Sequence, residues 1–256
     1  MIPWLNGNTA FPPAESALRS PNGLLAAGGE LSPHRLLEAY RLGIFPWFNP
    51  GEPILWWSPD PRMVLVPGEF RISRSLARVL RSAAYEVRFD TAFEQVMRAC
   101  AAPRARQKSA GTWIHEDMIE AYVELHKMGY AHSVEVWTPK KSLPMQTEDR
   151  TSRQSSMAGG QEMVLAGGLY GVCIGRMFYG ESMFSKTSNA SKIALAHLAR
   201  QLVRWQFGMI DCQMNTPHLA SLGAREIPRS EFIVSLRELV HCAPVTDWRF
   251  DTDLFV

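Results

Sequence analysis

The sequence predicts an α+β fold, with a small loop-rich N-terminal domain (residues 1–62) and a larger domain (residues 63–256) built on a mainly antiparallel sheet. Two observations predict this class. Prolines, glycines and tryptophans are concentrated in the first 60 residues, which is typical of loops rather than of long regular elements. From residue 63 onward, helical and alternating patterns are mixed, and a run of neighbouring strands precedes one long helix and a further strand.

The N-terminal domain contains one clear predicted helix. Ser32 is a typical N-cap, Pro33 suits the first helical position, and Gly43 ends the helix. The residues expected to face inward are Leu36, Leu37 and Tyr40. The two stretches that follow, 44–48 and 53–62, place aromatic residues beside prolines and cannot form a regular helix. They predict a small unit, rich in loops, that closes over another part of the molecule.

The larger domain is predicted to mix helices and strands. A capping box formed by Thr91 and Glu94 opens one helix. Residues 138–162 are polar with almost no apolar periodicity, which indicates an exposed, mobile loop or a long hairpin tip. The expected strands are 63–66, 131–137, 163–166, 169–174, 176–181 and 209–213. The expected helices begin at 73 and 91 and span 115–128, 190–207, 218–222 and 231–240.

The composition is that of an ordinary globular protein and excludes several classes. The 256 residues are 46% hydrophobic and include eight Trp and twelve Phe, so disorder is excluded as the main state. The four cysteines are widely spaced in apolar contexts, which excludes a disulfide scaffold and indicates reduced thiols. The N-terminus carries no export signal, and the longest apolar run (163–174) is too short to span a bilayer. We therefore expect a cytoplasmic protein with no membrane partner.

Charge is distributed unevenly, although the net charge is only +2. Between Arg71 and Lys108 there are nine basic and three acidic residues, so this segment carries +6. Ser73 can cap a helix here, and three arginines share one of its faces: Arg74, Arg78 and Arg81. Such a row suits phosphate oxygens, because each guanidinium is permanently charged and can bind two oxygens. A merely solvated helix face is the alternative.

Asp211 and Gln213 lie two residues apart on the predicted strand 209–213. A period of two places both side chains on one face of the strand. An acid and an amide in this arrangement could deprotonate an amine and hold a carbonyl, so both are candidate catalytic residues. The alternative is a polar pair that simply ends a strand.

Glu181 is expected in a turn between an apolar strand and the long helix. A carboxylate there could bind a cation or cap the following segment, and the sequence leaves both open. Cys212 with His218 would make a nucleophile and a base, but the cysteine alternates onto the apolar face, which favours a buried thiol. No His or Cys cluster has metal-ligand spacing, and no glycine pair matches a nucleotide-binding motif. Neither a metal nor another cofactor is expected.

One apolar set could form a core or line a pocket for a bulky apolar group. Its members are Leu169, Phe178, Met183, Leu195, Leu198 and Ile210. The order strand, strand, helix, strand around this set is similar to acyltransferases that use acyl-CoA. Those enzymes need a glycine-rich turn at the start of the long helix to hold pyrophosphate. Here residues 185–190 contain no glycine, which argues against CoA as the donor.

Taken together, the motifs resemble the leucyl/phenylalanyl-tRNA–protein transferases over nearly the whole chain and in the same order. The N-terminal matches are PNGLLAAGGELSP (21–33), GIFPWF (43–48) and 54–62. The central matches are GTWI (111–114), AHSVEVW (131–137), 168–172 and GESMFS (180–185). The C-terminal matches are 190–192, 210–213, 221–224 and 227–229.

The resemblance implies an acetyltransferase-like (GNAT-like) larger domain that takes its acyl group from aminoacyl-tRNA. Family members move Leu or Phe, and Met less readily, onto the N-terminal Arg or Lys of proteins, which marks those proteins for degradation. The aminoacyl ester is already activated, so no cofactor is implied. We expect the chain to act as a monomer.

The resemblance also implies roles for the candidate residues. Those that would hold the terminal adenosine of the tRNA are Trp47 and Trp113, with Tyr40 and Tyr122 nearby. Those that would contact the tRNA body are Arg74, Arg78 and Arg81. Those that would line the amino-acid pocket are Leu169, Phe178, Met183, Leu195, Leu198 and Ile210. Asp211 and Gln213 would assist attack by the acceptor amine, and Glu181 would help to receive the cationic N-terminal residue.

Two departures from the family pattern stand out. Leu169 and Leu198 stand where some family members have Met and Phe; both positions stay apolar, so we expect any effect on side-chain preference rather than on reaction type. The polar segment 138–162 is longer than the short turn expected there. Two other functions stay open at this point, a CoA-dependent N-acyltransferase and a non-catalytic tRNA-binding module.

Overall fold

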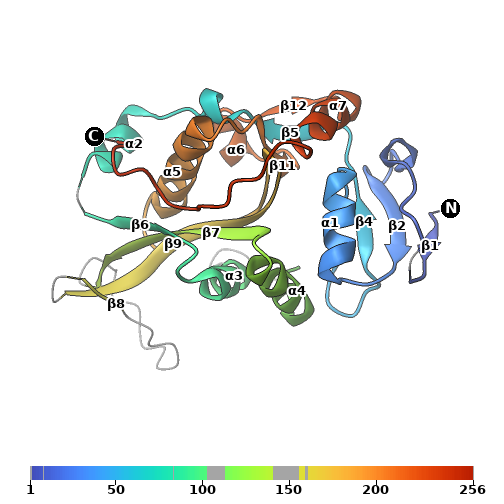
Figure 1. Cartoon of the computed structure of the whole chain (residues 1–256), viewed down its shortest axis with the longest axis horizontal. Coiled ribbons are helices and arrows are strands. Elements are labelled where there is room, and N and C mark those ends of the chain that lie inside the picture. Colours follow the sequence, from blue (N-terminus) through green and yellow to red (C-terminus); the bar gives the residue numbers. More distant parts are fainter. Residues whose placement is uncertain are drawn as a thin grey trace.

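The computed structural model describes residues 2–7, 9–82, 84–102, 113–140, 156–158 and 161–255. Two sheets organise these residues (Figure 1). The smaller sheet has the order β1 (Trp4–Leu5), β2 (Leu24–Gly28), β4 (Leu55–Trp57), β3 (Phe45–Pro46). Helix α1 (Pro33–Arg41) lies between β2 and β3 in the chain and packs beside this sheet.

The larger sheet is formed by strands from β5 onward in the chain. It is mainly antiparallel, since β10 and β11 are the only neighbouring strands of this sheet, among the described residues, that pair in parallel. Its order is β12 (Arg225–Ile227), β5 (Arg62–Leu65), β11 (Met209–Gln213), β10 (Met177–Ser185), β9 (Gln161–Ile174), β7 (Ala131–Pro139), β6 (Glu86–Phe89). A short strand, β8 (Ser156–Ala158), pairs with β9. The predicted α+β class with a mainly antiparallel sheet is confirmed. The domain division at residues 62 and 63 stays a prediction.

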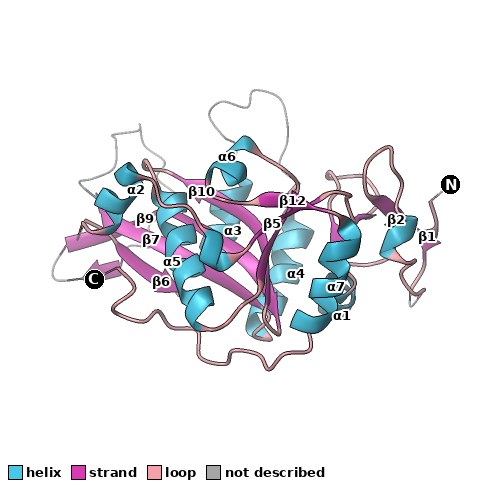
Figure 2. Ribbon diagram, turned by 90° about the horizontal axis from the view of Figure 1, so that it is seen from above, coloured by secondary structure: helices cyan, strands magenta, loops and turns pink. Residues whose placement is uncertain are grey.

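Helices cover both faces of the larger sheet (Figure 1). One face carries α3 (Phe93–Ala101) and α4 (Glu116–Lys127), and the other carries α2 (Arg74–Leu80) and α5 (Ala190–Arg204). Two further helices, α6 (Pro217–Ser221) and α7 (Arg229–Leu239), follow β11, and single 3-10 turns span Ala14–Ser16 and Pro67–Glu69. Figure 2 shows α1 and α7 next to each other where the two parts of the molecule meet. Among the described residues, no helix has both the length and the apolar character needed to cross a membrane.

Two hydrophobic clusters hold these layers together. The first joins the N-terminal part to the α3 and α4 face, and it buries Tyr40 and Tyr122 completely. The second lies beneath α5 and includes the apolar set singled out in the sequence. The interface between the two parts is therefore continuous with the core of the larger one.

Local capping signals agree with the sequence at two helices and fail at a third. The Ser32 and Ser73 hydroxyls accept hydrogen bonds from the backbone of Arg35 and Leu76, as N-caps should. The Thr91 and Glu94 capping box does not form.

The start of α3 uses a different acceptor. The buried carboxylate of Glu135, on β7, accepts hydrogen bonds from the backbone N–H of Thr91 and Ala92 and from the Thr91 hydroxyl. Glu94 pairs with Arg98 one turn along the helix instead. The capping group thus comes from a strand residue 43 positions away from Ala92 in the chain, which local patterns do not reveal.

The strands predicted over 163–166 and 169–174 are one continuous strand, β9. Gly167 and Gly168, which lie between the two predicted strands, continue the strand and allow close packing. A Cβ at Gly167 would lie 2.4 Å from the Cβ of Ala190 on α5, and one at Gly168 would lie 2.6 Å from the carbonyl oxygen of Val134 on β7. Only glycine lets the strand approach its neighbours this closely.

The expectations for the turn at Glu181 and for the polar segment 138–162 also need correction. Strand β10 continues through Glu181 to Ser185, with a β-bulge between Gly180 and Ser182. Parts of the polar segment belong to the sheet, because β7 extends to Pro139 and β8 pairs with β9. Residues 141–155 and 159–160 lie outside the described residues, so the rest of that expectation stays a prediction.

Candidate active site

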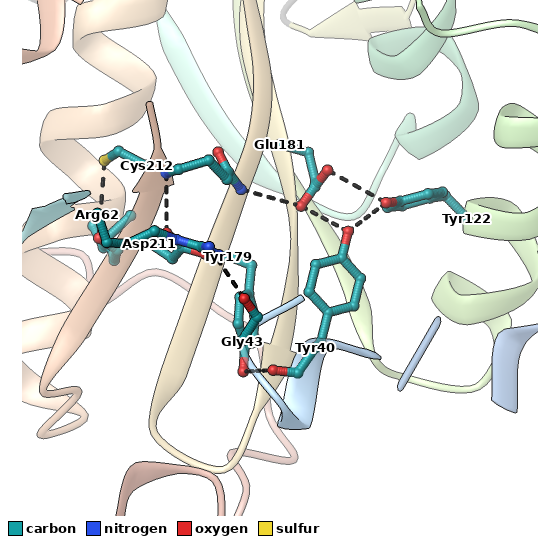
Figure 3. A network of polar contacts seen from close by, with 10 residues as sticks. Tyr40, Gly43, Arg62, Tyr122, Tyr179, Glu181, Asp211 and Cys212 are labelled. Atoms are coloured by element: carbon teal, nitrogen blue, oxygen red, sulfur yellow. Dashed lines mark hydrogen bonds and ion pairs between the residues drawn. The ribbon is translucent and has the colours of Figure 1, made fainter. Parts of the chain in front are cut away.

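The predicted polar residues meet where α1, α4, β10 and β11 converge, at the junction of the two parts of the molecule (Figure 3). The bulge in β10 leaves Glu181 without a partner across the sheet, which frees its side chain to turn toward the helices. Tyr40 comes from the last turn of α1 and Tyr122 from the middle of α4. Three elements that are distant in the chain therefore supply one polar cluster.

The hydroxyls of Tyr40 and Tyr122 enclose the Glu181 carboxyl. Tyr40 Oη lies 2.8 Å from Glu181 Oε1, and Tyr122 Oη lies 3.3 Å from Oε2. The two tyrosine hydroxyls also contact each other directly. Gln213 completes the cluster, with its amide Nε2 3.4 Å from Glu181 Oε1. Both tyrosines are fully buried, whereas Glu181 and Gln213 are partly buried.

Burial sets the acidity of this cluster. Desolvation raises the pKa of Glu181 to about 8, and the negative charge of Asp211 also raises it. Hydrogen bonds from Tyr40 and Tyr122 and the positive charge of Arg62 lower this pKa, but they do not offset the burial. The pKa values of Tyr40 and Tyr122 rise well above the ordinary value, again mainly through burial and then through the Glu181 charge. Within the described part of the chain, Glu181 forms no salt bridge. Among the described residues, no cation pairs with this carboxyl group.

Asp211 occupies a different environment from the one expected. Arg62, on β5, donates from Nε to Asp211 Oδ1 at 2.8 Å and from Nη2 to Oδ2 at 2.6 Å, and neither side chain reaches solvent. Arg62 Nη1 also donates to the carbonyl oxygen of Gly43 at 3.1 Å, and the guanidinium lies over the Phe45 and Phe232 rings. Asp211 is therefore a buried, fully paired carboxylate rather than an open one.

The strict alternation predicted for Asp211 and Gln213 is broken. A β-bulge lies between the two residues, and Gln213 has a left-handed backbone with φ of 55°. The backbone N–H of Gln213 donates to Asp211 Oδ1 at 3.0 Å, which holds this unusual conformation. The bulge separates the roles of the two side chains. Asp211 faces Arg62, and Gln213 faces Glu181.

Sequence reasoning missed Arg62. It lies at the end of a proline-rich loop, and no motif distinguishes it there. A signal nevertheless existed, because Arg62 and Asp211 are opposite charges placed in otherwise apolar strands, 62–65 and 209–212. Fully buried charges are rare without a partner, so such a pair could have been expected to meet.

The two tryptophans lie on neighbouring segments. Trp47 is 37% exposed, and its ring lies edge-on to Trp57, whose Nε1 donates to the Trp47 carbonyl at 2.7 Å. Trp113 is partly buried against the first hydrophobic cluster, which also contains Tyr40 and Tyr122. An edge-on contact between Phe48 and His115, with ring centroids 4.8 Å apart, brings the two segments side by side. Their role in holding adenosine stays a prediction.

The predicted apolar set is brought together in the second hydrophobic cluster. Leu169, Phe178, Leu195, Leu198 and Ile210 are buried there, and Met183 packs at its edge, partly exposed. Gly171 is required beside Phe178, since a Cβ there would lie 2.6 Å from the ring. These side chains pack together in the core. That they line a pocket for the amino acid stays a prediction.

The predicted basic face is present and free. Arg74 and Arg78 are exposed on α2, and Arg81 is exposed at its C-terminal end. In the described part of the chain, none of the three forms a salt bridge. Figure 1 places α2 at the end of the larger sheet that is remote from α1.

Other candidates do not add to this site. Among the described residues, no group of three His, Cys, Asp or Glu side chains could hold a metal ion. Cys212 is buried, with a pKa raised mainly by burial, which agrees with a structural thiol. A cleft of about 600 Å³ between β1, β2 and the loop before β4 shares no residue with the polar cluster.

The fold and the cluster define a two-sheet α+β protein in which a carboxyl group lies between two tyrosines at the junction of its parts. The family described as leucyl/phenylalanyl-tRNA protein transferase matches residues 64–143 and 151–237, and its N-terminal domain matches residues 29–60. The chain belongs to the leucyl/phenylalanyl-tRNA–protein transferase family.

Similar proteins with that name come from several bacteria. One from Nitrosospira multiformis is 59% identical over 98% of this chain and 98% of its own length. One from Nitrosomonas europaea is 61% identical over 93% of this chain and 91% of its own length. One from Thiobacillus denitrificans is 58% identical over 94% of this chain and 96% of its own length. The similarity thus extends across both sheets.

Proposed function

We propose that this protein moves Leu or Phe, and Met less readily, from aminoacyl-tRNA to the N-terminal Arg or Lys of acceptor proteins, marking them for degradation. It acts as a cytoplasmic monomer and needs no cofactor. Family membership supports the reaction class. The proposed binding of a cationic acceptor residue is supported by Glu181. This carboxyl group is partly exposed, and the described part of the protein supplies no cation that pairs with it.

In this proposal the aminoacyl-tRNA contacts three regions. Its terminal adenosine lies against Trp47 and Trp113, near Tyr40 and Tyr122. The side chain of the esterified amino acid enters the apolar cluster past Met183, which is flexible and lies at the edge of that cluster. The tRNA body contacts the free arginines, which are Arg74, Arg78 and Arg81.

The chemistry is mainly positioning. An aminoacyl ester is already activated, so the enzyme has to align a neutral amine with the ester carbonyl carbon. Alignment of this kind is worth about 7–11 kcal/mol in favourable cases. Removal of a proton from the amine adds typically 10²–10⁴-fold. A ribose hydroxyl of the tRNA can carry that proton to the leaving oxygen.

Asp211 serves this reaction as a positioning residue. Both of its oxygens already accept hydrogen bonds from Arg62, so it is poorly suited to take a proton from the amine. Through its bond to the backbone of Gln213 it fixes the amide that faces Glu181. Gln213 is then the group of this pair that touches the reacting amine or carbonyl.

The test is incubation with radiolabelled Phe-tRNA and a peptide beginning with Arg, beside one beginning with Ala. Label should enter only the first peptide, and the variant Gln213→Ala should reduce transfer at least tenfold. Transfer from acetyl-CoA instead would favour a CoA-dependent acyltransferase. Tight tRNA binding with no transfer to either peptide would favour a binding module.

A further inference from the structure

Strands β10 and β11 pair over only part of their length. They run in parallel, and the paired residues are Met177 to Tyr179 on β10 and Met209 to Asp211 on β11. Each strand has a β-bulge directly after this stretch. Beyond the bulges, β10 continues along β9 to Ser185, and among the described strands none pairs with its other edge. That edge of β10 is therefore left without a strand partner.

The end of β11 turns its backbone away from β10. The N–H of Gln213 donates to Asp211 Oδ1 at 3.0 Å, and the N–H of Met214 donates to the carbonyl oxygen of Cys212 at 2.7 Å. Both donors are used within the end of β11 itself, and the chain then enters α6. The place beside β10 that a longer β11 would occupy is thus not taken by β11.

One hydrogen bond shows which backbone groups of β10 point to this edge. The N–H of Lys186 donates to the carbonyl oxygen of Ala166 on β9 at 2.7 Å. Because successive residues of a paired strand point their backbone groups to opposite edges, Phe184 also faces β9. Met183 and Ser185 then point their N–H and C=O groups to the edge that β11 has left. We call these four groups the open edge.

The open edge is accessible. Residues 181–184 are partly exposed and Ser185 is exposed, although residues 167–170 beside them on β9 are buried. Gly180 lies where the two strands part, and a Cβ there would point toward β11, 3.5 Å from the carbonyl oxygen of Asp211. Glycine therefore keeps the start of the edge clear. Unpaired backbone groups of this kind are a template for another extended chain.

We propose that the acceptor protein binds along the open edge, its first residues forming a parallel strand in the place that β11 leaves. The identity of the occupant rests on the proposed function. The acceptor amine lies at the bulge, because Gln213 and Glu181 meet there. From that point the acceptor chain runs outward beside β10 toward Ser185.

Main-chain pairing suits this partner. An enzyme that selects proteins by their first residue has to accept many different sequences after it. Backbone hydrogen bonds supply affinity that does not depend on the acceptor's side chains. The esterified amino acid of the donor fits the open edge less well, since a single residue can pair with at most two of its four groups.

The parallel arrangement fixes which acceptor residues form hydrogen bonds. A residue that faces its neighbour in a parallel pair donates to one carbonyl and accepts from the N–H two residues further along. The third acceptor residue therefore donates to the carbonyl of Met183 and accepts from the N–H of Ser185. The first accepts from the N–H of Met183. The second and fourth point their backbone groups away from β10.

N-methylated acceptor peptides test this register in transfer of Phe from Phe-tRNA. Each peptide begins with Arg, and one carries a methyl group on the backbone nitrogen of its third residue. This change removes the donor to Met183 and should raise the KM for the peptide by about tenfold or more. The matched control carries the methyl group on its fourth residue and should behave like the unmodified peptide. Equal effects of the two methyl groups, or a larger effect at the fourth residue, would overturn the proposal.

Hydrogen exchange of single amides in the unchanged protein gives a second readout. In the free protein, the amides of Met183 and Ser185 should exchange faster than that of Phe184, which faces β9. The Arg peptide, at a concentration that saturates transfer, should slow the first two amides. A peptide beginning with Ala, at the same concentration, should slow them less because it lacks the cation for Glu181.

Unchanged exchange at Met183 and Ser185 with bound Arg peptide would overturn the proposal. Protection by Phe-tRNA but not by the Arg peptide would assign the open edge to the donor and would overturn it as well. These failures are distinct from failure of the proposed function, in which Phe does not enter the unmodified Arg peptide at all.

Discussion

Arg62 donates two hydrogen bonds to Asp211 in a region from which solvent is excluded. Removing two charges from water is costly, and their mutual attraction repays that cost only while both are present. One partner left alone would be a buried, uncompensated charge. The pair is therefore more sensitive to single substitutions than to simultaneous replacement by apolar residues.

We expect Arg62→Met to lower the free energy of unfolding by about 3–5 kcal/mol, because it leaves Asp211 unpaired. The double variant Arg62→Met with Asp211→Leu should be clearly more stable than either single variant. Urea denaturation followed by circular dichroism measures all three proteins. Additive losses in the double variant would contradict the assignment of a coupled pair.

Glu181 predicts a pH dependence of stability with a definite sign. In the unfolded chain this carboxyl loses its proton near its ordinary pKa of 4.5, whereas in the folded protein it keeps the proton until about pH 8. Between these values the folded state binds more protons, so the free energy of unfolding falls as the pH rises. Above about pH 8 the loss is complete.

The variant Glu181→Gln should lack this contribution. The difference in unfolding free energy between it and the unchanged protein should therefore shift by about 5 kcal/mol across the window, at about 1.4 kcal/mol for each unit of pKa difference. Denaturation curves at several pH values measure it. Parallel pH profiles for the two proteins would show that Glu181 titrates as it does in the unfolded chain.

For single residues, the sequence identifies the candidate site residues better than it predicts their arrangement in space. Asp211, Gln213 and Glu181 were identified as candidates, and the structure brings Gln213 to Glu181. Their geometry depends on two β-bulges, which result from pairing with distant strands. Arg62 was missed because its role requires a partner 149 positions away.

Strand β9 relies on glycine where it passes beneath α5 and beside β7. We expect Gly168→Ala to lower the free energy of unfolding by about 1–3 kcal/mol, since its Cβ would press on the carbonyl of Val134. Gly68→Ala is the matched control, because nothing lies within 4 Å of a Cβ there. Thermal unfolding of the two variants measures the contrast, and equal melting temperatures would refute the packing argument.

Helix α2 presents exposed arginines that form no salt bridge with any residue in the described ranges. Replacing Arg74, Arg78 and Arg81 by Glu should weaken tRNA binding and flatten its salt dependence, because fewer counterions are released from the tRNA backbone. The single reversal Arg237→Glu, on the exposed face of α7, serves as the control. Filter binding over a range of salt concentrations measures both. An unaltered salt slope in the triple variant would remove α2 from the RNA interface.

Helices and strands can be predicted from the sequence where the residues that fix their ends lie close by in the chain. The caps at Ser32 and Ser73 act within one turn of their helices, and both form as expected. The start of α3 and the continuity of β9 depend on Glu135 and on neighbours in space, so patterns within a short window misjudged both.

Across the whole molecule, the C-terminal segment after α7 returns over the larger sheet and joins its layers. Trp248 stacks on His132 with ring centroids 3.6 Å apart and meets Trp205 and Phe89 edge-on. Phe250 stacks on Phe89, and Arg204 on α5 pairs with Asp251. The segment thus contacts β6, β7 and α5 together.

Trp248→Ala should therefore lower the free energy of unfolding by about 2 kcal/mol, less than for a fully buried tryptophan because the ring is partly exposed. Chemical denaturation measures the loss. Trp4→Ala, which truncates a ring that is 60% exposed, is the comparison and should have little effect. A similar loss in both variants would indicate that the segment does not stabilise the sheet.

The side chain of Arg62 spans the boundary between the two parts of the protein. On one side it donates a hydrogen bond to the carbonyl oxygen of Gly43, just after α1. On the other side it pairs with Asp211 on β11, the strand that ends in Gln213. A half-assembled chain, with its first sheet not yet docked, would lack the contact that anchors this arginine. The Gln213 amide would then lose its place beside Glu181, so we expect a newly made chain to form this polar cluster only once the two parts have docked.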